Sequence, residues 1–293
     1  MQKQKPVNIT DFLNITSGLF EEKKIKNPRL NAEILLSGIL NCSRLDLYMN
    51  FEKPLTEAET DSFRTCVRRR LNHEPLQYIT GKTSFYGLEF EVNRDVLIPR
   101  QETELLVERI LDDIRIRKLK KAKIFEIGTG SGCISISVAK NLQMHGTDYE
   151  IMSVDVSENA VKTAGTNLEL NGLDNGKVRF LVQDIFKTEK LPGKFDYIIS
   201  NPPYISLKDY ESLDSEVREY EPRLSLTDNG SGLKFYERIF RIGSDIDFSG
   251  KIFCEIGFGQ KDEIEKIING YNYKKHAFYK DYSEIYRIAE AEK

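Results

Sequence analysis

Phe125-Glu126-Ile127-Gly128-Thr129-Gly130-Ser131-Gly132 is the stretch of sequence that decides the fold. A run of apolar residues ends at Gly128, glycines follow at alternate positions, and helical spacing begins near residue 132. Glycine lets the backbone turn sharply and lets a ligand approach it closely, because glycine has no Cβ. The stretch therefore predicts a strand, a tight turn and a helix at the start of an α/β sheet.

Downstream of this turn, short apolar runs alternate with candidate helices. Strands that alternate with helices indicate a mostly parallel sheet with helices on both faces. The last two runs, AFYKDY and EIYRIAEAE, predict two more strands as an antiparallel pair at one edge. The other predicted strands are KIFEIG, EIMSVDVS, VRFLVQDIF, FDYIIS and GKIFCEIG, and the predicted helices lie around 132–144, 157–170, 232–243 and 260–269.

The stretch before residue 101 has a different character. Asn27-Pro28 predicts an N-cap followed by a first-turn proline, and Thr56 with Glu59 matches the capping box at a helix start. The segment TSFYGLEFEV then changes to the pattern of a β-hairpin. We predict a helical bundle over 1–75, a β-hairpin linker over 76–100 and an α/β domain over 101–293.

Composition narrows the class of protein. The formal net charge is −3, whereas proteins that neutralise many phosphates usually carry a basic excess. The N-terminal MQKQKPVNITDF is too polar for a signal peptide, and no apolar run approaches the roughly 18 residues of a membrane helix, so we expect a cytoplasmic protein. Cysteines and histidines are scattered, which suits a reducing compartment and predicts no metal site: Cys42, Cys66, Cys133, Cys254, His73, His145 and His276.

The glycine-rich turn is a candidate ligand loop. A helix N-terminus after such a turn attracts anions, but the spacing is G-x-G-x-G, not the dinucleotide G-x-G-x-x-G. Asp155 ends the next strand, where a carboxylate can accept ribose hydroxyls, and Asp184 ends the third, where it can accept from an adenine amino group. Each could instead cap a helix. With Glu126, three successive strands end in an acid, and the constellation resembles class I S-adenosylmethionine-dependent methyltransferases.

Asn201-Pro202-Pro203-Tyr204, directly after the strand FDYIIS, is the candidate reacting centre. An amide or aryl amine nitrogen is a poor nucleophile because its lone pair is delocalised. The side-chain oxygen of Asn201 can accept one N–H of such a group, and the carbonyl of Pro202 can accept the other. Tyr204 can stack on the flat substrate, and proline stiffens the backbone. The motif predicts catalysis by positioning, without metal or covalent intermediate.

Longer segments are similar to the HemK/PrmC protein-(glutamine-N5) methyltransferases. Glu74-Pro75-Leu76-Gln77-Tyr78-Ile79-Thr80-Gly81 and Leu97-Ile98-Pro99-Arg100-Gln101-Glu102-Thr103-Glu104 carry this resemblance, followed by EIGTGSG, VDVS, QDIF and SNPPYI. It implies a helical bundle, a hairpin and a Rossmann-like class I domain with a mostly parallel seven-stranded sheet. It also implies that the substrate is the glutamine of the Gly-Gly-Gln loop in peptide-chain release factors, and that the first 75 residues dock the substrate protein.

The resemblance also assigns site residues. It implies that the loop and the strand-end acids bind S-adenosyl-L-methionine and that Asn201-Pro202-Pro203-Tyr204 holds the glutamine amide, with Asn201, Pro202 and Tyr204 as catalytic residues. Arg100 and Glu102 could shape the substrate entrance, but such charges more often cap or pair, so we assign them no role. The cofactor-binding set is Glu126, Gly128, Thr129, Gly130, Ser131, Gly132, Asp155, Asp184, Ile185 and Asn201.

Two other functions fit part of the sequence. An adenine-N6 methyltransferase acting on DNA or RNA would use the same Asn-Pro-Pro-Tyr logic on an extruded base, with Arg68-Arg69-Arg70 as its basic run. A non-catalytic adaptor would bind the cofactor or a release factor without turnover, but its Asn-Pro-Pro-Tyr or glycine loop should then be broken, and both are intact.

Overall fold

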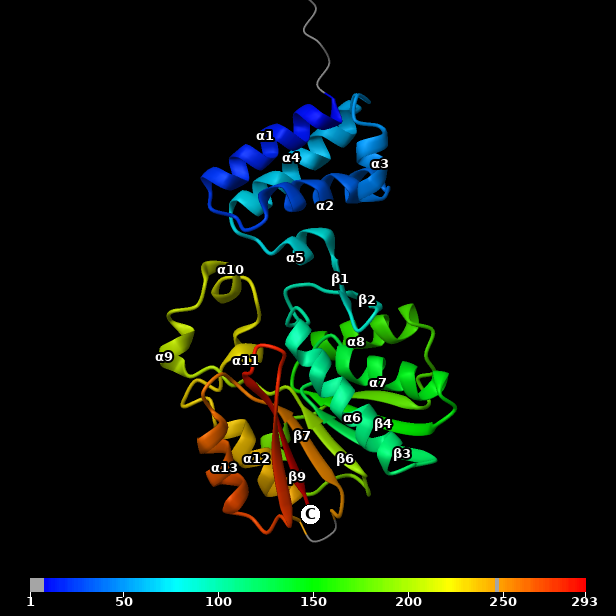
Figure 1. Cartoon of the computed structure of the whole chain (residues 1–293), viewed down its shortest axis with the longest axis vertical. Helices are drawn as coiled ribbons and strands as arrows, with labels where there is room; N and C mark the ends of the chain where they lie inside the picture. Colours follow the sequence, from blue (N-terminus) through cyan, green and yellow to red (C-terminus); the bar gives the residue numbers. More distant parts are fainter. Residues whose placement is uncertain (1–7, 246–247) are drawn as a thin grey trace, which may run out of the picture. The chain divides into compact units, whose positions relative to one another are not determined.

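The computed structural model describes residues 8–245 and 248–293 (Figure 1). The chain divides into two compact units, Met1–Gly81 with Ser215–Tyr220, and Lys82–Asp214 with Glu221–Lys293. We call them the helical unit and the sheet unit. Residues 1–7, which include the start of the predicted bundle and most of the polar N-terminus, lie outside the described residues. This division gives the hairpin to the sheet unit and the segment 215–220 to the helical unit.

The helical unit contains the helices expected from the capping signals. Capping boxes begin three of them, and the box of Thr56 and Glu59 is confirmed. Asn27 stands at the predicted N-cap position, but its backbone is left-handed (φ 52°) and its side chain makes no capping hydrogen bond, so only the first-turn proline acts as predicted. The helices are α1 (Ile9–Glu22), α2 (Pro28–Leu40), α3 (Arg44–Met49), α4 (Glu57–Leu71), α5 (Leu76–Thr80) and α10 (Ser215–Arg218).

The sheet unit begins with the predicted hairpin and continues into a seven-stranded sheet in the order β5-β4-β3-β6-β7-β9-β8. Strands β3 to β7 are parallel to one another, and β9 is antiparallel to both β7 and β8. The last two strands do pair antiparallel as predicted, but β9 inserts beside β7. The strands are β1 (Lys82–Phe85), β2 (Leu88–Glu91), β3 (Lys121–Ile127), β4 (Asp148–Asp155), β5 (Val178–Val182), β6 (Tyr197–Ser200), β7 (Lys251–Glu255), β8 (Lys275–Lys280) and β9 (Tyr286–Glu292).

Helices cover both faces of this sheet (Figure 1). Successive strand residues point to opposite faces, so Ile124 packs into one hydrophobic cluster with α6, α7 and α8, and Phe125 packs into a second cluster with α12 and α13. The helices are α6 (Glu104–Ile116), α7 (Cys133–Met144), α8 (Glu158–Leu170), α9 (Leu207–Tyr210), α11 (Arg223–Leu226), α12 (Lys234–Gly243) and α13 (Lys261–Asn269), with 3-10 turns η1 (Gln101–Thr103) and η2 (Ile185–Lys187).

Strand order places the candidate site. From β3 the chain builds the sheet in one direction through β4 and β5, and it then returns to the other side of β3 with β6 and β7. Ligands of open α/β sheets bind at such a switch point, just beyond the carboxyl ends of the strands. The glycine loop follows β3 and the Asn-Pro-Pro-Tyr segment follows β6, so the two predicted motifs meet at this point.

Candidate active site

The loop between β3 and α7 uses its glycines in two ways. Gly128, Gly130 and Gly132 all have positive φ, at 87°, 52° and 80°. A Cβ on Gly132 would lie 3.0 Å from Ile136 and 3.1 Å from Ala164, so this glycine allows the helix to pack closely. A Cβ on Gly130 would meet nothing within 4 Å, which leaves the middle of the loop open to the pocket.

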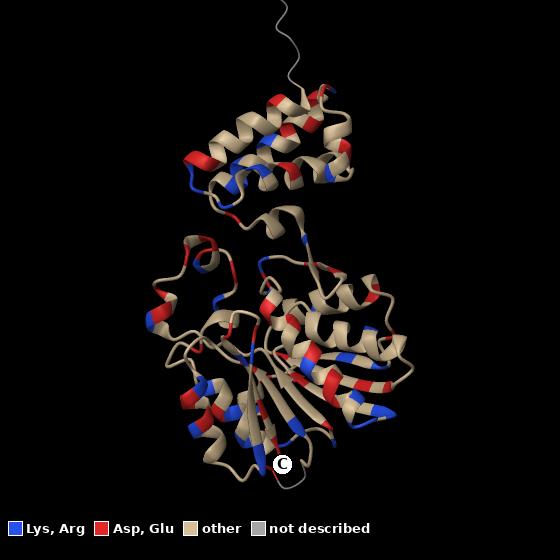
Figure 2. Cartoon of the chain, viewed as in Figure 1, with Lys and Arg blue, Asp and Glu red and all other residues tan. Residues whose placement is uncertain are grey.

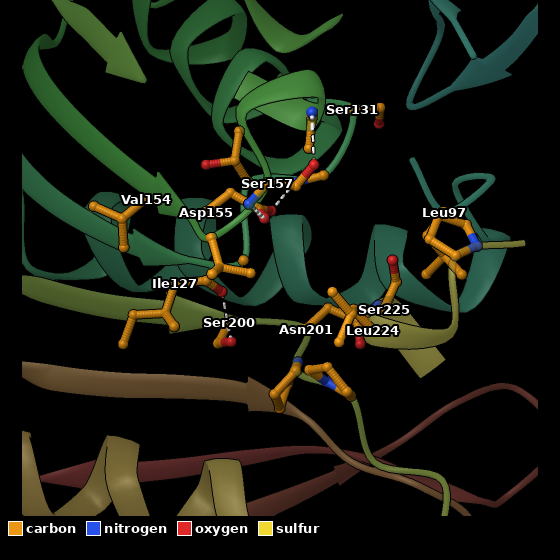
Figure 3. Close-up of a pocket in the computed structure, with 18 of the residues that line it drawn as sticks. Leu97, Ile127, Ser131, Val154, Asp155, Ser157, Ser200, Asn201, Leu224 and Ser225 are labelled. Carbon is orange, nitrogen blue, oxygen red and sulfur yellow. Dashed lines mark hydrogen bonds between the residues drawn. The ribbon is translucent and has the colours of Figure 1, made fainter. Parts of the chain in front are cut away.

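Asp155, at the end of β4, holds the loop in place. Its Oδ2 accepts the backbone N–H of Gly130 at 2.9 Å, and its Oδ1 accepts that of Ser157 at 2.9 Å (Figure 3). Asp155 also lines the pocket. A carboxylate oxygen has more than one acceptor site, so these two bonds leave capacity for the ligand hydroxyls predicted from the sequence.

Asp184 and Ile185 follow β5 and also line the pocket. The Oδ1 of Asp184 accepts the backbone N–H of Phe186 at 2.9 Å and caps η2. The other oxygen, Oδ2, lies 3.7 Å from Lys187 Nζ. Capping and ligand binding, which were alternatives at the sequence level, are compatible at this residue, because a carboxylate oxygen has more than one acceptor site. The buried side chain of Ile185 supplies an apolar wall beside it.

Glu126 occupies a different place from the other two acids. It is fully buried in β3 and does not line the pocket. Its Oε2 accepts the hydroxyls of Ser135 and Ser153, and Ser153 is itself 2.7 Å from Thr129 Oγ1 in the loop. Burial raises the pKa of Glu126 from 4.5 to about 7. This geometry corrects the expected rim of three acids: Glu126 supports the loop from beneath.

The pocket itself has a volume of about 380 Å³, within the range of small-molecule sites. Residues from the ends of β3, β4, β5 and β6 line it, and Leu97, Leu224 and Ser225 close its far side (Figure 3). Ser131 lines it as well, and its buried Oγ has no hydrogen-bond partner among the described residues. A buried polar atom without a partner is costly unless a ligand satisfies it. The glycine-built loop, the acids that end β4 and follow β5, and this hydroxyl together fit a nucleoside carrying a polar tail.

Asn201 and Pro202, which carry the two predicted acceptors, lie at the pocket. Asn201, Pro202 and Pro203 all line the pocket. The side-chain nitrogen of Asn201 donates to Thr103 Oγ1 at 3.1 Å. Within residues 8–245 and 248–293, neither the side-chain oxygen of Asn201 nor the carbonyl oxygen of Pro202 accepts a hydrogen bond. Two acceptors are therefore available at one end of the pocket.

Tyr204 is placed differently from the expectation. It is not among the residues that line the pocket. Its ring packs with the second hydrophobic cluster, its hydroxyl lies 3.4 Å from Glu255 Oε1, and Gln260 donates to its carbonyl oxygen at 2.8 Å. Burial raises its pKa above the ordinary value. In this geometry Tyr204 anchors the Asn-Pro-Pro-Tyr segment to the core and does not present a ring to the pocket.

Thr103 and Glu255 belong to the site but were not predicted from the sequence. Thr103 lines the pocket, and its hydroxyl is 2.6 Å from Oε2 of Glu255, which is 2% exposed at the end of β7. Burial raises the pKa of Glu255 to about 7. Glu255 ends an apolar strand in the same way as the three acids noted earlier, and this signal could have found it. Thr103 stood in a segment noted only for its resemblance.

Arg100 also reaches the site. It lines the pocket and forms a salt bridge with Glu221, whose side chain is buried and also accepts the backbone N–H of Ile98 at 3.3 Å. This ion pair joins the segment before α6 to the segment before α11. Arg100, left without a role at the sequence level, therefore helps to build the pocket wall.

The fold and the site together define a class I S-adenosylmethionine-dependent methyltransferase. The PrmC N-terminal domain family matches residues 11–81, and the methyltransferase small domain family matches residues 101–217. A release factor glutamine methyltransferase of Chlorobaculum tepidum is 36% identical over 98% of this chain and 98% of its own length. Another from Geobacter sulfurreducens is 40% identical over 90% of this chain and 89% of its own length. The chain belongs to the release factor glutamine methyltransferase family.

Family membership identifies the methyl donor as S-adenosylmethionine and confirms the predicted fold and enzyme class. Figure 2 shows Lys and Arg mixed with Asp and Glu along the helices of both units. In the basic run considered for nucleic acid, Arg69 pairs with Glu74 at 2.8 Å and Arg70 pairs with Glu216 at 3.0 Å. Both arginines therefore form ion pairs within the helical unit.

Among the helices that the structure describes, none is long and apolar enough to cross a membrane.

Proposed function

We propose that the chain transfers a methyl group from S-adenosylmethionine to the N5 atom of the glutamine in the Gly-Gly-Gln loop of a peptide-chain release factor. The observation that carries this proposal is the pair of open acceptors, Asn201 Oδ1 and the Pro202 carbonyl, at one end of the pocket. A primary amide has two N–H groups, and two acceptors can hold both and turn the nitrogen toward the donor. The proposed substrate is a translation factor, so the proposal includes a cytoplasmic location.

The chain contributes position and polarity to this reaction. When bound, S-adenosylmethionine supplies a methyl group on a sulfonium, an electrophile that needs no further activation. Asn201 and Pro202 hold the amide and stabilise the positive charge that develops on its nitrogen. Holding two reactants near 3 Å and in line replaces a bimolecular encounter with a unimolecular one. The proton leaves the methylated nitrogen through these acceptors or to water.

The direct test is transfer of labelled methyl to a purified class I release factor, with Gly-Gly-Gln and Gly-Gly-Ala versions side by side. We expect label on the Gly-Gly-Gln protein alone. Asn201→Ala should lower kcat by about 10²–10³-fold, the usual effect of removing one pre-placed polar group. Asn141→Ala, which removes a helix-surface asparagine bonded to Ser137, is the matched control and should keep full activity.

Duplex and single-stranded nucleic acid, added as competitors for label, test the adenine alternative. Label in nucleic acid would refute the glutamine assignment and keep the methyltransferase class. Binding of S-adenosylmethionine without transfer to any of these substrates would instead support the non-catalytic adaptor. Full activity of Asn201→Ala would remove Asn201 from the site.

We further propose that the helical unit docks the release factor. Its helix α3 and the turn that follows expose four large apolar side chains, Leu45, Tyr48, Met49 and Phe51, which we call the α3 patch. Leu45 and Met49 are 68% and 67% exposed. Apolar side chains grouped on a surface mark interaction sites more often than scattered ones do. The PrmC N-terminal domain match covers this patch.

A further inference from the structure

The side chain of Asn201 is held by a chain of hydrogen bonds that leads into the protein core. Asn201 Nδ2 is 3.1 Å from Thr103 Oγ1, and Thr103 Oγ1 is 2.6 Å from Glu255 Oε2. Thr103 and Glu255 are 2% exposed each. The three residues come from η1, the end of β6 and the end of β7, so widely separated parts of the sequence build the chain.

When Glu255 is ionised, the chemistry of these groups determines the direction of each bond. A threonine hydroxyl has one hydrogen to donate. In the ionised form of Glu255, Oε2 can only accept, so it accepts the Thr103 hydroxyl. Thr103 therefore donates to Glu255 and has only lone pairs left for Asn201. The amide of Asn201 must then present its NH2 to Thr103, which leaves its oxygen toward the pocket.

We propose that Thr103 and Glu255 are positioning residues that select one of the two orientations of the Asn201 amide, with the oxygen toward the substrate. The inference rests on the proposed role of Asn201. A rotation of 180° would direct the NH2 of Asn201 at the N–H groups of a glutamine, so donors would face donors. It would also leave the Asn201 oxygen against Thr103 lone pairs. Thr103 and Glu255 hold the acceptor ready before the substrate arrives, which is the condition for electrostatic preorganisation.

Glu255 is itself held in place from both sides. Its second oxygen, Oε1, lies 3.4 Å from the hydroxyl of Tyr204, and its backbone carbonyl accepts the hydroxyl of the fully buried Tyr236 at 2.9 Å. Tyr204 is the last residue of the Asn-Pro-Pro-Tyr segment, so the segment is linked to Glu255 directly at Tyr204 and through Thr103 at Asn201. This explains why a tyrosine that does not line the pocket stands in the motif.

Thr103→Val tests the inference because it removes the hydroxyl and keeps the shape of the side chain. We expect kcat to fall about tenfold or more, since the amide of Asn201 can then rotate. The Kd for S-adenosylmethionine should stay within about twofold, and the KM for the release factor should change less than kcat does. Thr103→Ser restores the hydroxyl and should recover most of kcat.

Thr163→Val is the matched control. Thr163 is also buried and also accepts an asparagine NH2, that of Asn93 at 3.2 Å, but it does not line the pocket. Its kcat should match that of the unchanged protein. If Thr103→Val lowers the Tm too far for assay, Thr103→Ala with Thr103→Ser as its partner gives the same comparison.

The outcomes separate this inference from the proposed function. Wild-type kcat in the Thr103 hydroxyl deletions, beside an inactive Asn201→Ala, would overturn the positioning role and leave the proposed function intact. Equal loss of kcat in Thr103→Ser and Thr103→Val would also overturn it, because shape and not the hydroxyl would then matter. An active Asn201→Ala would instead show that the failure lies in the proposed function.

Discussion

At the scale of single residues, the site rests on two buried carboxyl groups, Glu126 and Glu255. Each lies at or near the end of a central strand, and each accepts hydroxyl hydrogen bonds from residues that belong to a functional loop or touch it. For both, burial raises the pKa from 4.5 to about 7. Glu126 Oε1 has no partner among the described atoms. A buried acid with incomplete hydrogen bonding reduces the stability of the fold, so Glu126 lowers stability at the place where it supports the glycine loop.

Glu126 should make the stability of the protein depend on pH. The unfolded chain loses the Glu126 proton near pH 4.5, whereas the folded chain keeps it to about pH 7. The folded state binds more protons in this window, so the free energy of unfolding falls as pH rises from about 4.5 to about 7 and levels off above. The contribution of this group is about 3 kcal/mol. Urea unfolding of Glu126→Gln at pH 5, 6, 7 and 8 should show a smaller decline than the unchanged protein.

Glu255 also titrates in the unchanged protein, so the comparison is between two rates at which the free energy of unfolding falls with pH. A matched substitution at an exposed glutamate, Glu57→Gln in the first turn of α4, should leave the decline unaltered. Equal declines in Glu126→Gln and in the unchanged protein would mean that Glu126 is already ionised in the fold at pH 5.

Single residues also show what the sequence alone can predict. Asp155 and Asn201 are recognisable because they end apolar strands beside a glycine loop and a proline pair, and their neighbours in the chain determine where they point. The places of Tyr204 and Thr103 could not be predicted in this way, because both depend on contacts with Glu255, which is far from both residues in the sequence. Which groups meet across strands β6 and β7 is a tertiary property, and residue spacing does not contain it.

At the scale of elements, the long connection from β6 to β7 determines where the Asn-Pro-Pro-Tyr segment lies. The stretch LSLTDNGSGL within it folds around Asp228, whose carboxylate accepts the backbone N–H groups of Gly230 at 2.7 Å, Gly232 at 2.9 Å and Lys234 at 3.1 Å. This turn brings Gly232 against the backbone of Tyr204. A Cβ on Gly232 would lie 2.2 Å from the Tyr204 carbonyl oxygen. The glycine is therefore required for the Asn-Pro-Pro-Tyr segment to lie where it does.

Gly232→Ala should displace that segment. Gly232 has a φ of 81°, so alanine there adds backbone strain of about 1–2 kcal/mol to the steric clash, which costs about 1–3 kcal/mol. A shift of about 1 Å in a positioned group can lower the rate about 10²-fold, so we expect a large loss of kcat. The measurements are urea unfolding and methyl transfer to the release factor.

Gly146→Ala is the control that separates the effect of backbone strain from that of the steric clash. Gly146 also has a positive φ, 69°, but a Cβ there would meet nothing within 4 Å. It should lose stability by the strain alone and keep its kcat. If Gly232→Ala lost no more stability and no more activity than Gly146→Ala, the close packing against Tyr204 would have no functional importance.

The positions of the helices could be predicted from the sequence more closely than the order of the strands in the sheet. The helices expected around 132–144, 157–170, 232–243 and 260–269 are α7, α8, α12 and α13, each within about two residues, because apolar periodicity and glycine positions are local signals. The insertion of β9 between β7 and β8 could not be read from the sequence. Both final runs have similar apolar patterns, so the sequence does not distinguish which of them lies beside β7.

At the scale of the whole molecule, chain continuity links the two units at two places. The chain passes from the helical unit into the hairpin after Gly81, and the segment Ser215–Tyr220 returns to the helical unit from the connection that follows the Asn-Pro-Pro-Tyr segment. Within the helical unit, the buried guanidinium of Arg70 binds Glu216 at 3.0 Å, Asn31 at 2.8 Å and the carbonyl of Glu74 at 2.8 Å. The proposed docking unit thus holds part of the same connection that carries the reacting segment.

The docking proposal makes a prediction that separates recognition of a protein from chemistry on an amide. Replacing Leu45 and Met49 with aspartate places charges in the α3 patch, where a partner would have to desolvate them. We expect the KM for the intact release factor to rise about tenfold or more, with kcat and the Kd for S-adenosylmethionine unchanged, because the pocket lies entirely in the other unit. Turnover of a short Gly-Gly-Gln peptide should be unaffected.

Ile116→Asp, at an equally apolar and 77% exposed position at the end of α6, is the control. It should leave the KM and kcat for both substrates unchanged. A double variant that processed the intact factor with an unaltered KM would show that the α3 patch does not dock it.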